Sequence, residues 1–264
     1  MRIMSIEEQI PVRCRARSGT SLYIGTNISV RAVLVIAITA LLLWTSRTQA
    51  QVPVDQLDKP PAGAKVFTIL STSGTNGKAF LWTTRDGAHM SRESILLRGQ
   101  VWELDQSLKF GSDGMPSAMI VRGVTPQGDA AETFEVHDGK ASWKSPVDAG
   151  SHSYNSAALY VPEGGTSSGS TQLLIETLLA SPDKSIALLP GGRARAERLT
   201  DVVVGEGAQK KIVTAWAITG LSPSPLPVWT SEDNKFFGTV GGLSILPVGY
   251  EHATIYLDLL PKRN

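Results

Sequence analysis

Apolar and polar residues alternate with a period of two along several short runs between Val66 and Trp143. They are among the short strand-like runs Ala79–Thr83, Ile95–Leu104, Ala118–Val124 and Glu132–Val136. Turn dipeptides lie at short intervals in the same region, and they are Ser73-Gly74, Asn76-Gly77, Asp86-Gly87, Asp113-Gly114, Gln127-Gly128 and Asp138-Gly139. Glycine supplies the positive φ that tight hairpin turns require. The pattern therefore predicts a meander of antiparallel strands.

The second half of the chain combines strand-like runs with a Leu-rich run. The strand-like runs are Ile186–Leu189, Val202–Val204, Ile212–Ile218, Pro227–Trp229 and Lys235–Gly238. Thr171–Ala180 has Ser170 or Thr171 available as N-cap and is followed by Pro182, so a short buried helix is predicted there. The preceding Gly164–Ser170 is predicted to be a flexible loop.

A second helix is predicted over Gly249–Leu260, close to the end of the sequence. Its apolar positions fall on one helical stripe, which consists of Tyr250, Ala253, Leu257 and Leu260. Such a stripe needs a partner, and that partner is either the sheet or something absent from this chain.

Together these runs predict a mainly β protein of the β-rich α+β class. Because alternating strands have one face on a core, we expect a curved antiparallel meander sheet covered by one or two short helices. Residues 51–65 carry Pro53, Pro60 and Pro61 and are predicted to be an extended linker. Residues 66–260 form the β-rich module, with subdomains 66–163 and 171–260 as an alternative division.

Residues 1–50 have the layout of a leader and a secretory signal. Arg31 precedes Ala32–Trp44, a run of 13 residues without a charge, and a small residue at which a peptidase could cut, Ala50, lies shortly after it. The run is shorter than the roughly 20 apolar residues of a bilayer span. We predict cleavage near Ala50 and a periplasmic or secreted protein without a stable membrane span. A retained anchor and a buried core helix are the alternatives.

Charge and cysteine content exclude two classes of function. Removing residues 1–50 takes away six Arg and two Glu, which leaves 19 basic and 22 acidic residues and a net charge of −3. Nucleic-acid binding is disfavoured, because it normally needs a basic surface. The single cysteine, Cys14, lies in the leader, so the mature part has neither a disulfide nor a thiol nucleophile.

Candidate metal ligands are scattered. The four histidines, His89, His137, His152 and His252, are isolated from one another, and no H-x-H, H-E-x-x-H or C-x-x-C pattern occurs. No G-x-S-x-G elbow is present, and adjacent residues of Ser151–Tyr154 would point to opposite sides of a strand. We therefore predict no catalytic, metal-binding or cofactor-binding residue and no cofactor, and we leave enzymatic activity open, leaning against it for this chain alone.

Two further groups of charged residues have simple structural interpretations. Arg193, Arg195 and Arg198 either form an anion-binding edge or, as we favour, lie on a solvated strand face. Glu232 and Asp233 lie in a predicted turn, where Asp favours the chain reversal itself.

Aromatic residues are spread over the strands of the meander. They are Phe80, Trp82, Trp102, Phe110, Phe134 and Trp143. Most are expected in the core or in cross-strand pairs. If several point into the concave side of a curved sheet, they would line an apolar cavity for acyl chains or similar ligands.

A block near the end of the chain resembles the region upstream of the metal-binding barrel in exported bacterial amidohydrolase-family proteins. The matching positions are Pro190-Gly191-Gly192 with Arg195 and Glu197, Ile218–Leu221 with Pro225 and Trp229, and Asp233 with Phe236-Phe237. The resemblance implies an export module associated with hydrolases of C–N bonds. In that family the barrel and its metal-binding histidine pair follow the terminal helix, so no catalytic residue is carried over to this chain.

Three functions remain open. The preferred one is a non-catalytic accessory or substrate-binding module, whose partner would be a separate amidohydrolase barrel. The second is a periplasmic carrier of a lipid or other small apolar ligand. The third is a fragment of a metal-dependent amidohydrolase.

Overall fold

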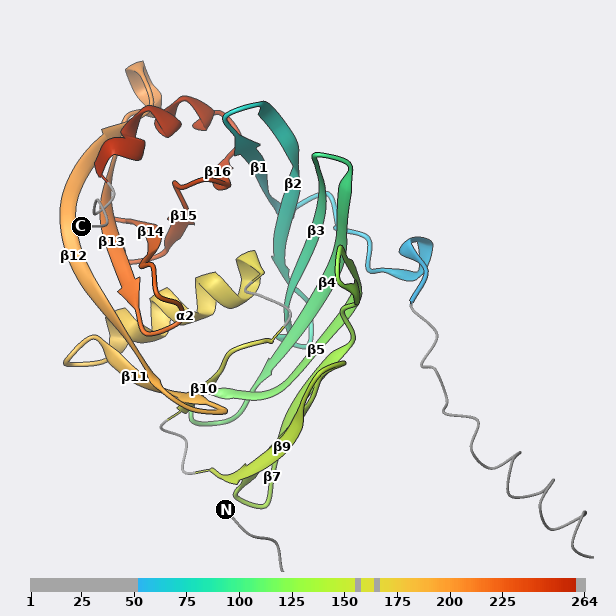
Figure 1. Ribbon diagram of the computed structural model, residues 1–264. Coiled ribbons are helices and arrows are strands. Elements are labelled where there is room, and N and C mark those ends of the chain that lie inside the picture. Colours follow the sequence, from blue (N-terminus) through green and yellow to red (C-terminus); the bar gives the residue numbers. More distant parts are fainter. Residues whose placement is uncertain (1–51, 155–157, 164–166, 260–264) are drawn as a thin grey trace, which may run out of the picture. The chain divides into compact units, whose positions relative to one another are not determined.

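The computed structural model describes residues 52–154, 158–163 and 167–259. The predicted leader and signal, with its cleavage position at Ala50, lies outside the described residues. Within them the chain is mainly β, with a curled antiparallel sheet and few helices (Figure 1). The predicted β-rich α+β class is therefore confirmed.

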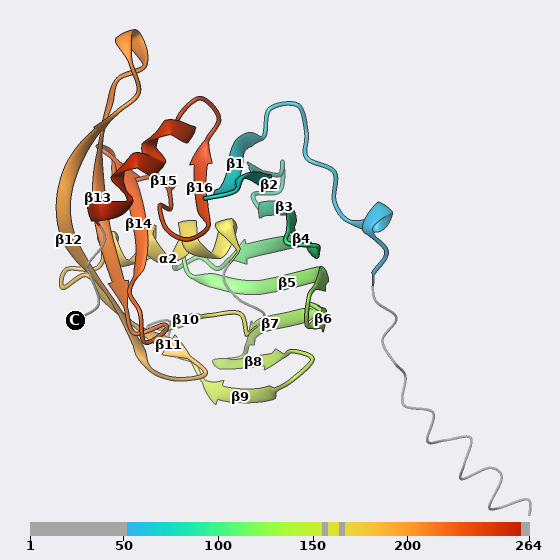
Figure 2. The same ribbon diagram turned by 45° about the horizontal axis from the view of Figure 1, so that its top comes forward.

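The first sheet has ten strands in the order β16-β1-β2-β3-β4-β5-β7-β8-β9, and β6 pairs with β5 beside this path. Its strands are β1 (Lys65–Ser71), β2 (Gly74–Thr83), β3 (His89–Leu97), β4 (Gln100–Phe110), β5 (Pro116–Thr125), β6 (Gly128–Asp129), β7 (Glu132–His137), β8 (Lys140–Lys144), β9 (Ala149–Ser153) and β16 (Ser244–Pro247). Figure 2 shows most of them stacked in this order. The meander predicted for the first half of the chain is thus present.

The second sheet has six strands in sequence order, and all pairs except β10–β11 are antiparallel. They are β10 (Ala158–Tyr160), β11 (Ser185–Leu189), β12 (Arg193–Val204), β13 (Lys211–Thr219), β14 (Leu226–Ser231) and β15 (Phe236–Gly238). Strand β16 then returns to the first sheet and pairs with β1. The chain therefore crosses from the second sheet back to the first within residues 171–260.

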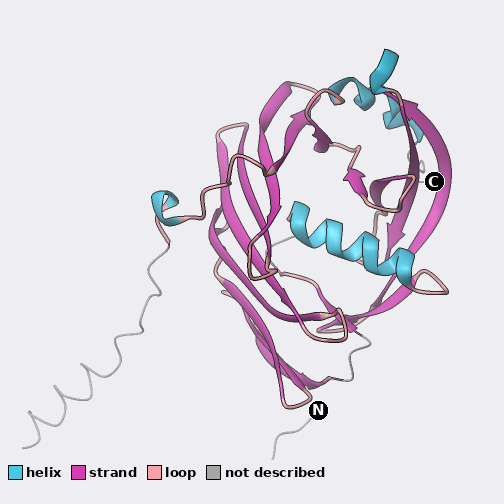
Figure 3. Ribbon diagram, turned by 180° about the vertical axis from the view of Figure 1, so that it is seen from behind, coloured by secondary structure: helices cyan, strands magenta, loops and turns pink. Residues whose placement is uncertain are grey.

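The two sheets curve around helix α2 (Ser168–Ala180), as Figures 1 and 3 show. This helix contacts β2 and β3 of the first sheet and β11, β12 and β15 of the second. The largest core cluster draws on all three layers, with Phe67 from the first sheet, Leu174 and Leu178 from the helix, and Trp216 from the second sheet. The helix is buried between the sheets, which makes it the central packing element.

Helix α2 begins earlier than the sequence predicts. Its N-cap is Ser167, whose Oγ accepts a hydrogen bond from the backbone N–H of Ser170, so Ser170 and Thr171 are not caps. Residues 168–170, predicted to be loop, are its first turn. The prediction failed because Gly169 is a poor helix former. A Cβ at Gly169 would lie only 2.8 Å from Ser91 Oγ, so the close approach to β3 favours glycine.

One predicted strand is two strands. The run Ile95–Leu104 is divided by a tight turn, because Arg98 and Gly99 have φ values of 53° and 78°. Leu97 ends β3 and Gln100 begins β4. Two consecutive positive φ values are characteristic of a two-residue hairpin, and an arginine at the first of these positions conceals that signal.

The terminal helix is a 3₁₀ helix, η3 (Glu251–Leu259), and not an α-helix. Tyr250 and Ala253 are buried in a second core cluster with Trp229 and Phe237 of the second sheet. Residues three apart lie on one side of a 3₁₀ helix, which explains why these two positions share a face. The partner of the predicted stripe is therefore this domain's own core. The side chains of Leu257 and Leu260 lie outside the described part.

The predicted linker is attached to the first sheet. After a single 3₁₀ turn, η1 (Val54–Gln56), Leu57 is buried and the backbone N–H of Asp58 donates to Asp105 Oδ2 at 2.7 Å. Arg122 pairs with Asp105 and also with Asp58, at 2.9 Å. Asp105 is only 2% exposed, so the segment covers a charged pair on the outer face of β4 and β5.

Candidate functional site

A cavity of about 740 Å³ lies between helix α2 and the inner face of the first sheet. Its apolar lining includes Leu81, Leu108, Phe110, Met115, Leu173 and Ala180. Several lining residues are exposed, among them Lys65, Thr83 and His89, so the cavity is open to solvent. Pockets for small molecules typically measure ~300–1,000 Å³ and are mainly apolar with a few placed polar groups. This cavity has the size and lining of a ligand site.

The strand register explains which side chains line the cavity. Leu81 of β2 pairs with Ser91 of β3, and Ser91 pairs with Gln106 of β4, so the three form one row across the sheet. Because side chains two residues apart share a face, His89 and Leu108 lie in the next row on the same face. The concave face thus carries both apolar and polar groups below the helix.

The first turn of α2 is hydrogen-bonded to the sheet through Gln106, a buried residue of β4. Gln106 Nε2 donates to Ser170 Oγ at 2.7 Å, and the hydroxyl of Ser167 donates to Gln106 Oε1. Gln106 Nε2 also lies 3.0 Å from Met119 Sδ. A satisfied buried network of this kind fixes the position of the elements it joins. The helix that forms one wall of the cavity is therefore held at its N-terminus.

Glu93 of β3 is the second attachment point of the helix. It is 5% exposed, and its carboxylate accepts a hydrogen bond from the backbone N–H of Ser168. Burial raises the pKa of Glu93 above its ordinary value, although the hydrogen bond to Ser168 opposes the shift. A carboxylate at a helix N-terminus satisfies a free N–H and interacts favourably with the helix dipole.

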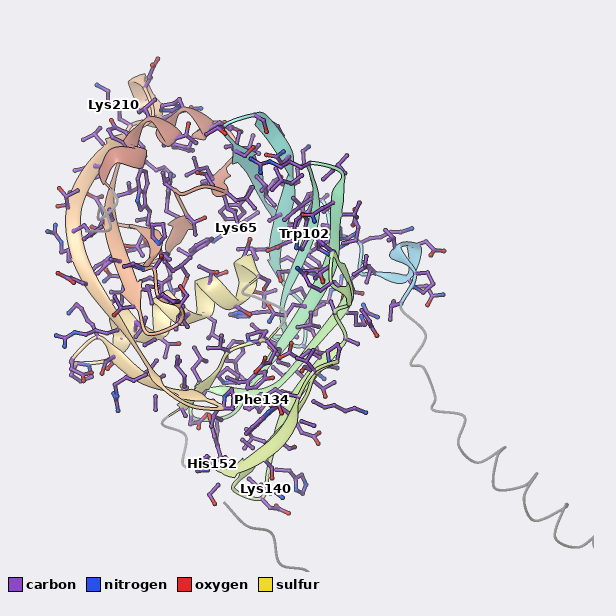
Figure 4. The ribbon with its side chains drawn as sticks, in the orientation of Figure 1. Lys65, Trp102, Phe134, Lys140, His152 and Lys210 are labelled. Carbon is purple, nitrogen blue, oxygen red and sulfur yellow. The ribbon has the colours of Figure 1, made fainter. Side chains whose placement is uncertain are left out.

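Charged side chains lie at the edge of the cavity. Lys235, before β15, forms an ion pair of 2.9 Å with Glu176 of α2, and this contact raises the pKa of Lys235. The other oxygen of Glu176 accepts from Gln172 Nε2 at 3.0 Å. Lys65 of β1 also lines the cavity, and Figure 4 shows it inside the curve of the sheets. In the described part of the chain, Lys65 has no ion-pair partner.

Each of the four histidines has different surroundings. His89 lines the cavity, with its ring centroid 4.6 Å from that of Phe110. His137 pairs with Asp138 on the surface at 2.9 Å, His152 is exposed on β9, and His252 accepts from the backbone N–H of Gly205. Figure 4 shows His152 at the far end of the sheet beside β9. Across residues 52–154, 158–163 and 167–259, no cluster of three or more His, Cys, Asp or Glu side chains could hold a metal ion.

The other charged candidates have structural roles. Arg193 and Arg195 alternate with buried Ala194 and Ala196 along β12, so they lie on its solvated face, as favoured. Arg193 bonds to Ser185 Oγ at 2.8 Å.

Arg198, also on β12, pairs with Asp201 at 2.5 Å. Asp233 lies in the turn before β15, and a hydrogen bond from the Ser231 hydroxyl lowers the pKa of Asp233. Glu232 is exposed in the same turn.

The aromatic residues of the meander have different surroundings. Phe134 and Trp143 join Tyr160 in a third core cluster, where the rings of Phe134 and Tyr160 stack at 4.8 Å. Trp102 packs against the largest cluster, and Figure 4 shows Trp102 and Phe134 on the first sheet. Trp82 and Phe110 line the cavity. Aliphatic and methionine side chains supply much of the remaining apolar lining, which the aromatic pattern did not predict.

The block at residues 189–238, which resembles amidohydrolase-family proteins in sequence, contributes strands to the second sheet. Ile218 and Phe236 belong to the largest core cluster, and Trp229 and Phe237 belong to the second. The block therefore has a packing role in this fold. Its one link to the cavity is Lys235, between Asp233 and Phe236.

Sequence reasoning missed Lys65, Glu93 and Gln106. Each lies on the inward face of its strand, where the period-two pattern places mainly apolar residues. Polar residues at such positions are the signal that could have identified them.

No helix within the described residues is long and apolar enough to cross a membrane. Comparisons of the chain with protein-family models, curated proteins and solved structures gave no match.

Proposed function

We propose that this chain is a non-catalytic binding protein that holds an amphiphilic small molecule between helix α2 and the first sheet. The observation that supports the proposal is the cavity of about 740 Å³. Burial of apolar ligand surface there would provide the main driving force, at about 0.8 kcal/mol for each CH₂ group. The polar groups around α2 and at the cavity edge would orient the ligand.

The proposal combines two of the functions predicted from the sequence. A carrier would release its ligand to another protein or to a membrane, whereas a substrate-binding module would present it to a hydrolase. The relation to amidohydrolases and the location in the periplasm or outside the cell remain predictions, based on the block at residues 189–238 and on the apolar run at residues 32–44.

The proposal is tested by blocking the cavity. Thr83 lines the cavity at the end of β2, and Lys78 is exposed on the opposite face of the same strand. We expect Thr83→Trp to abolish the fluorescence enhancement of a neutral naphthylamine probe, and Lys78→Trp to leave it unchanged. Equal binding by the wild type and Thr83→Trp, or no probe binding by the wild type, would contradict the proposal. Circular dichroism spectra of both variants, compared with that of the wild type, are the control for folding.

A further inference from the structure

We propose that the ligand of this cavity is an anionic amphiphile whose carboxylate or phosphate head binds Lys65 and whose apolar chain extends toward Phe110 and Met115. The inference rests on the proposed function and specifies the class of ligand. It depends on the position of Lys65, on the charges around it and on the distribution of apolar residues.

Lys65 faces the cavity because of its place in the sheet. It pairs with Leu81, which belongs to the largest core cluster, and it precedes Phe67 and Ile69, which are buried in that cluster. Side chains alternate between the faces of a strand, so Lys65 shares the inward face of Phe67 and Ile69. Figure 4 shows the same placement, inside the curve of the sheets. Lys65 is also exposed to solvent, so its cationic head lies where the cavity opens to solvent.

Glu176 and Lys235 of the lining are paired with each other, and Asp113 is bonded to the backbone. Both oxygens of Glu176 accept hydrogen bonds, one from Lys235 and the other from Gln172. Asp113 Oδ1 accepts from the backbone N–H of Met115 at 3.0 Å. Within the described part of the chain, Lys65 takes part in no ion pair. A bound anion would supply the charge that it lacks, and hydrogen bonds to charged groups are among the stronger ones in proteins.

Lys65 and the large apolar side chains Phe110 and Met115 lie on different parts of the lining. Lys65 lies on β1, beside Pro61 and Gly63, whereas Leu108 and Phe110 lie near the end of β4 and Met115 precedes β5. Neighbouring strands are ~4.8 Å apart, so the three steps from β1 to β4 span about 14 Å. An elongated molecule with a single anionic head can reach from Lys65 to Phe110 and Met115, beside which His89 and Asp113 also line the cavity.

The test compares four probes with the same twelve-carbon chain and different heads. They are dodecanoate, dodecyl phosphate, dodecanol and dodecyltrimethylammonium, and their affinities are measured by isothermal titration calorimetry below their critical micelle concentrations. The protein is expressed from its full coding sequence. We expect both anions to bind about tenfold more tightly than the alcohol, and the cation to bind most weakly. The tighter anion distinguishes a fatty acid from a phosphate-bearing lipid as the source of the head group.

Variants at Lys65 test the assignment of the residue. Methionine keeps the aliphatic stem of lysine, so Lys65→Met should weaken both anions about tenfold and change dodecanol less than twofold. Lys65→Arg should retain anion binding. Lys78→Met, on the outer face of β2, is the matched control and should change none of the affinities.

The outcomes separate failure of this inference from failure of the proposed function. Binding of dodecanol with equal or higher affinity than the anions would overturn the inference while preserving the proposed function. An equal loss for all heads in Lys65→Met would overturn it too, because the residue would then have only a structural role. Absence of binding for all four probes would contradict the proposed function itself.

Discussion

The buried carboxyl of Glu93 gives a stability prediction whose size depends on pH. Burial raises the pKa of Glu93 in the folded protein, so between its ordinary value and the raised value the folded state binds a proton that the unfolded state has released. The contribution of Glu93 to stability is therefore largest below the ordinary pKa and falls as pH rises through the window. The fall approaches about 1.4 kcal/mol per pH unit inside that window and stops above it.

Glu93→Gln isolates this contribution, because glutamine keeps a carbonyl oxygen that accepts from the backbone N–H of Ser168 but carries no charge. We expect the variant to match the wild type at pH 4 and to be more stable at pH 8. A difference of 1 kcal/mol corresponds to about 2–4 °C in Tm for a domain of this size. The measurement is thermal unfolding followed by circular dichroism from pH 4 to pH 9.

Glu93→Ala is the control for the hydrogen bond itself. It removes the acceptor at every pH and leaves a buried N–H unsatisfied, at a cost of about 1–3 kcal/mol. Two results would contradict the pH dependence expected from Glu93. One is a stability difference between the wild type and Glu93→Gln that does not change with pH, and the other is a difference that favours the wild type more strongly at pH 8.

Three further predictions concern packing and ion pairs. Arg122→Ala should lower stability in urea by about 3 kcal/mol, because Asp105 would remain buried without its partner. Gly169→Ala should lower it by about 1–3 kcal/mol despite the better helix propensity of alanine, since the new Cβ would crowd Ser91 Oγ. Truncation after Pro247 should lower the Tm by several degrees, because the buried side chain of Tyr250 is lost from the second core cluster. An unchanged stability or Tm in any of the three variants would contradict the argument made for it.

Local pattern predicts the strands of this protein well, because alternation and turn residues act over a few positions. The run Ala79–Thr83 lies within β2, and the turn at Asp138-Gly139 has the expected positive φ values. The same local logic fails where tertiary contacts decide the conformation. Gly169 is accommodated inside helix α2 because the helix packs closely on β3 at this point. The residues next to Gly169 in the sequence do not indicate this contact.

The candidate site could not be predicted for a related reason. Its parts are distant in sequence: Gln106 and Ser170 are 64 residues apart. Lys65 was predicted as the last residue of the linker, but it is the first residue of β1. Their meeting depends on how the sheets curve around α2, which the period-two pattern does not specify. The pattern predicted a concave face, and the side chains that line the cavity followed from the register.

The most direct test of the central claim is native mass spectrometry of the protein purified under mild conditions from the cells that make it. We expect a mass increase from one bound amphiphile, which is released by organic extraction and is absent from Thr83→Trp. A bare polypeptide mass that does not change when excess dodecanoate and dodecanol are added would contradict it.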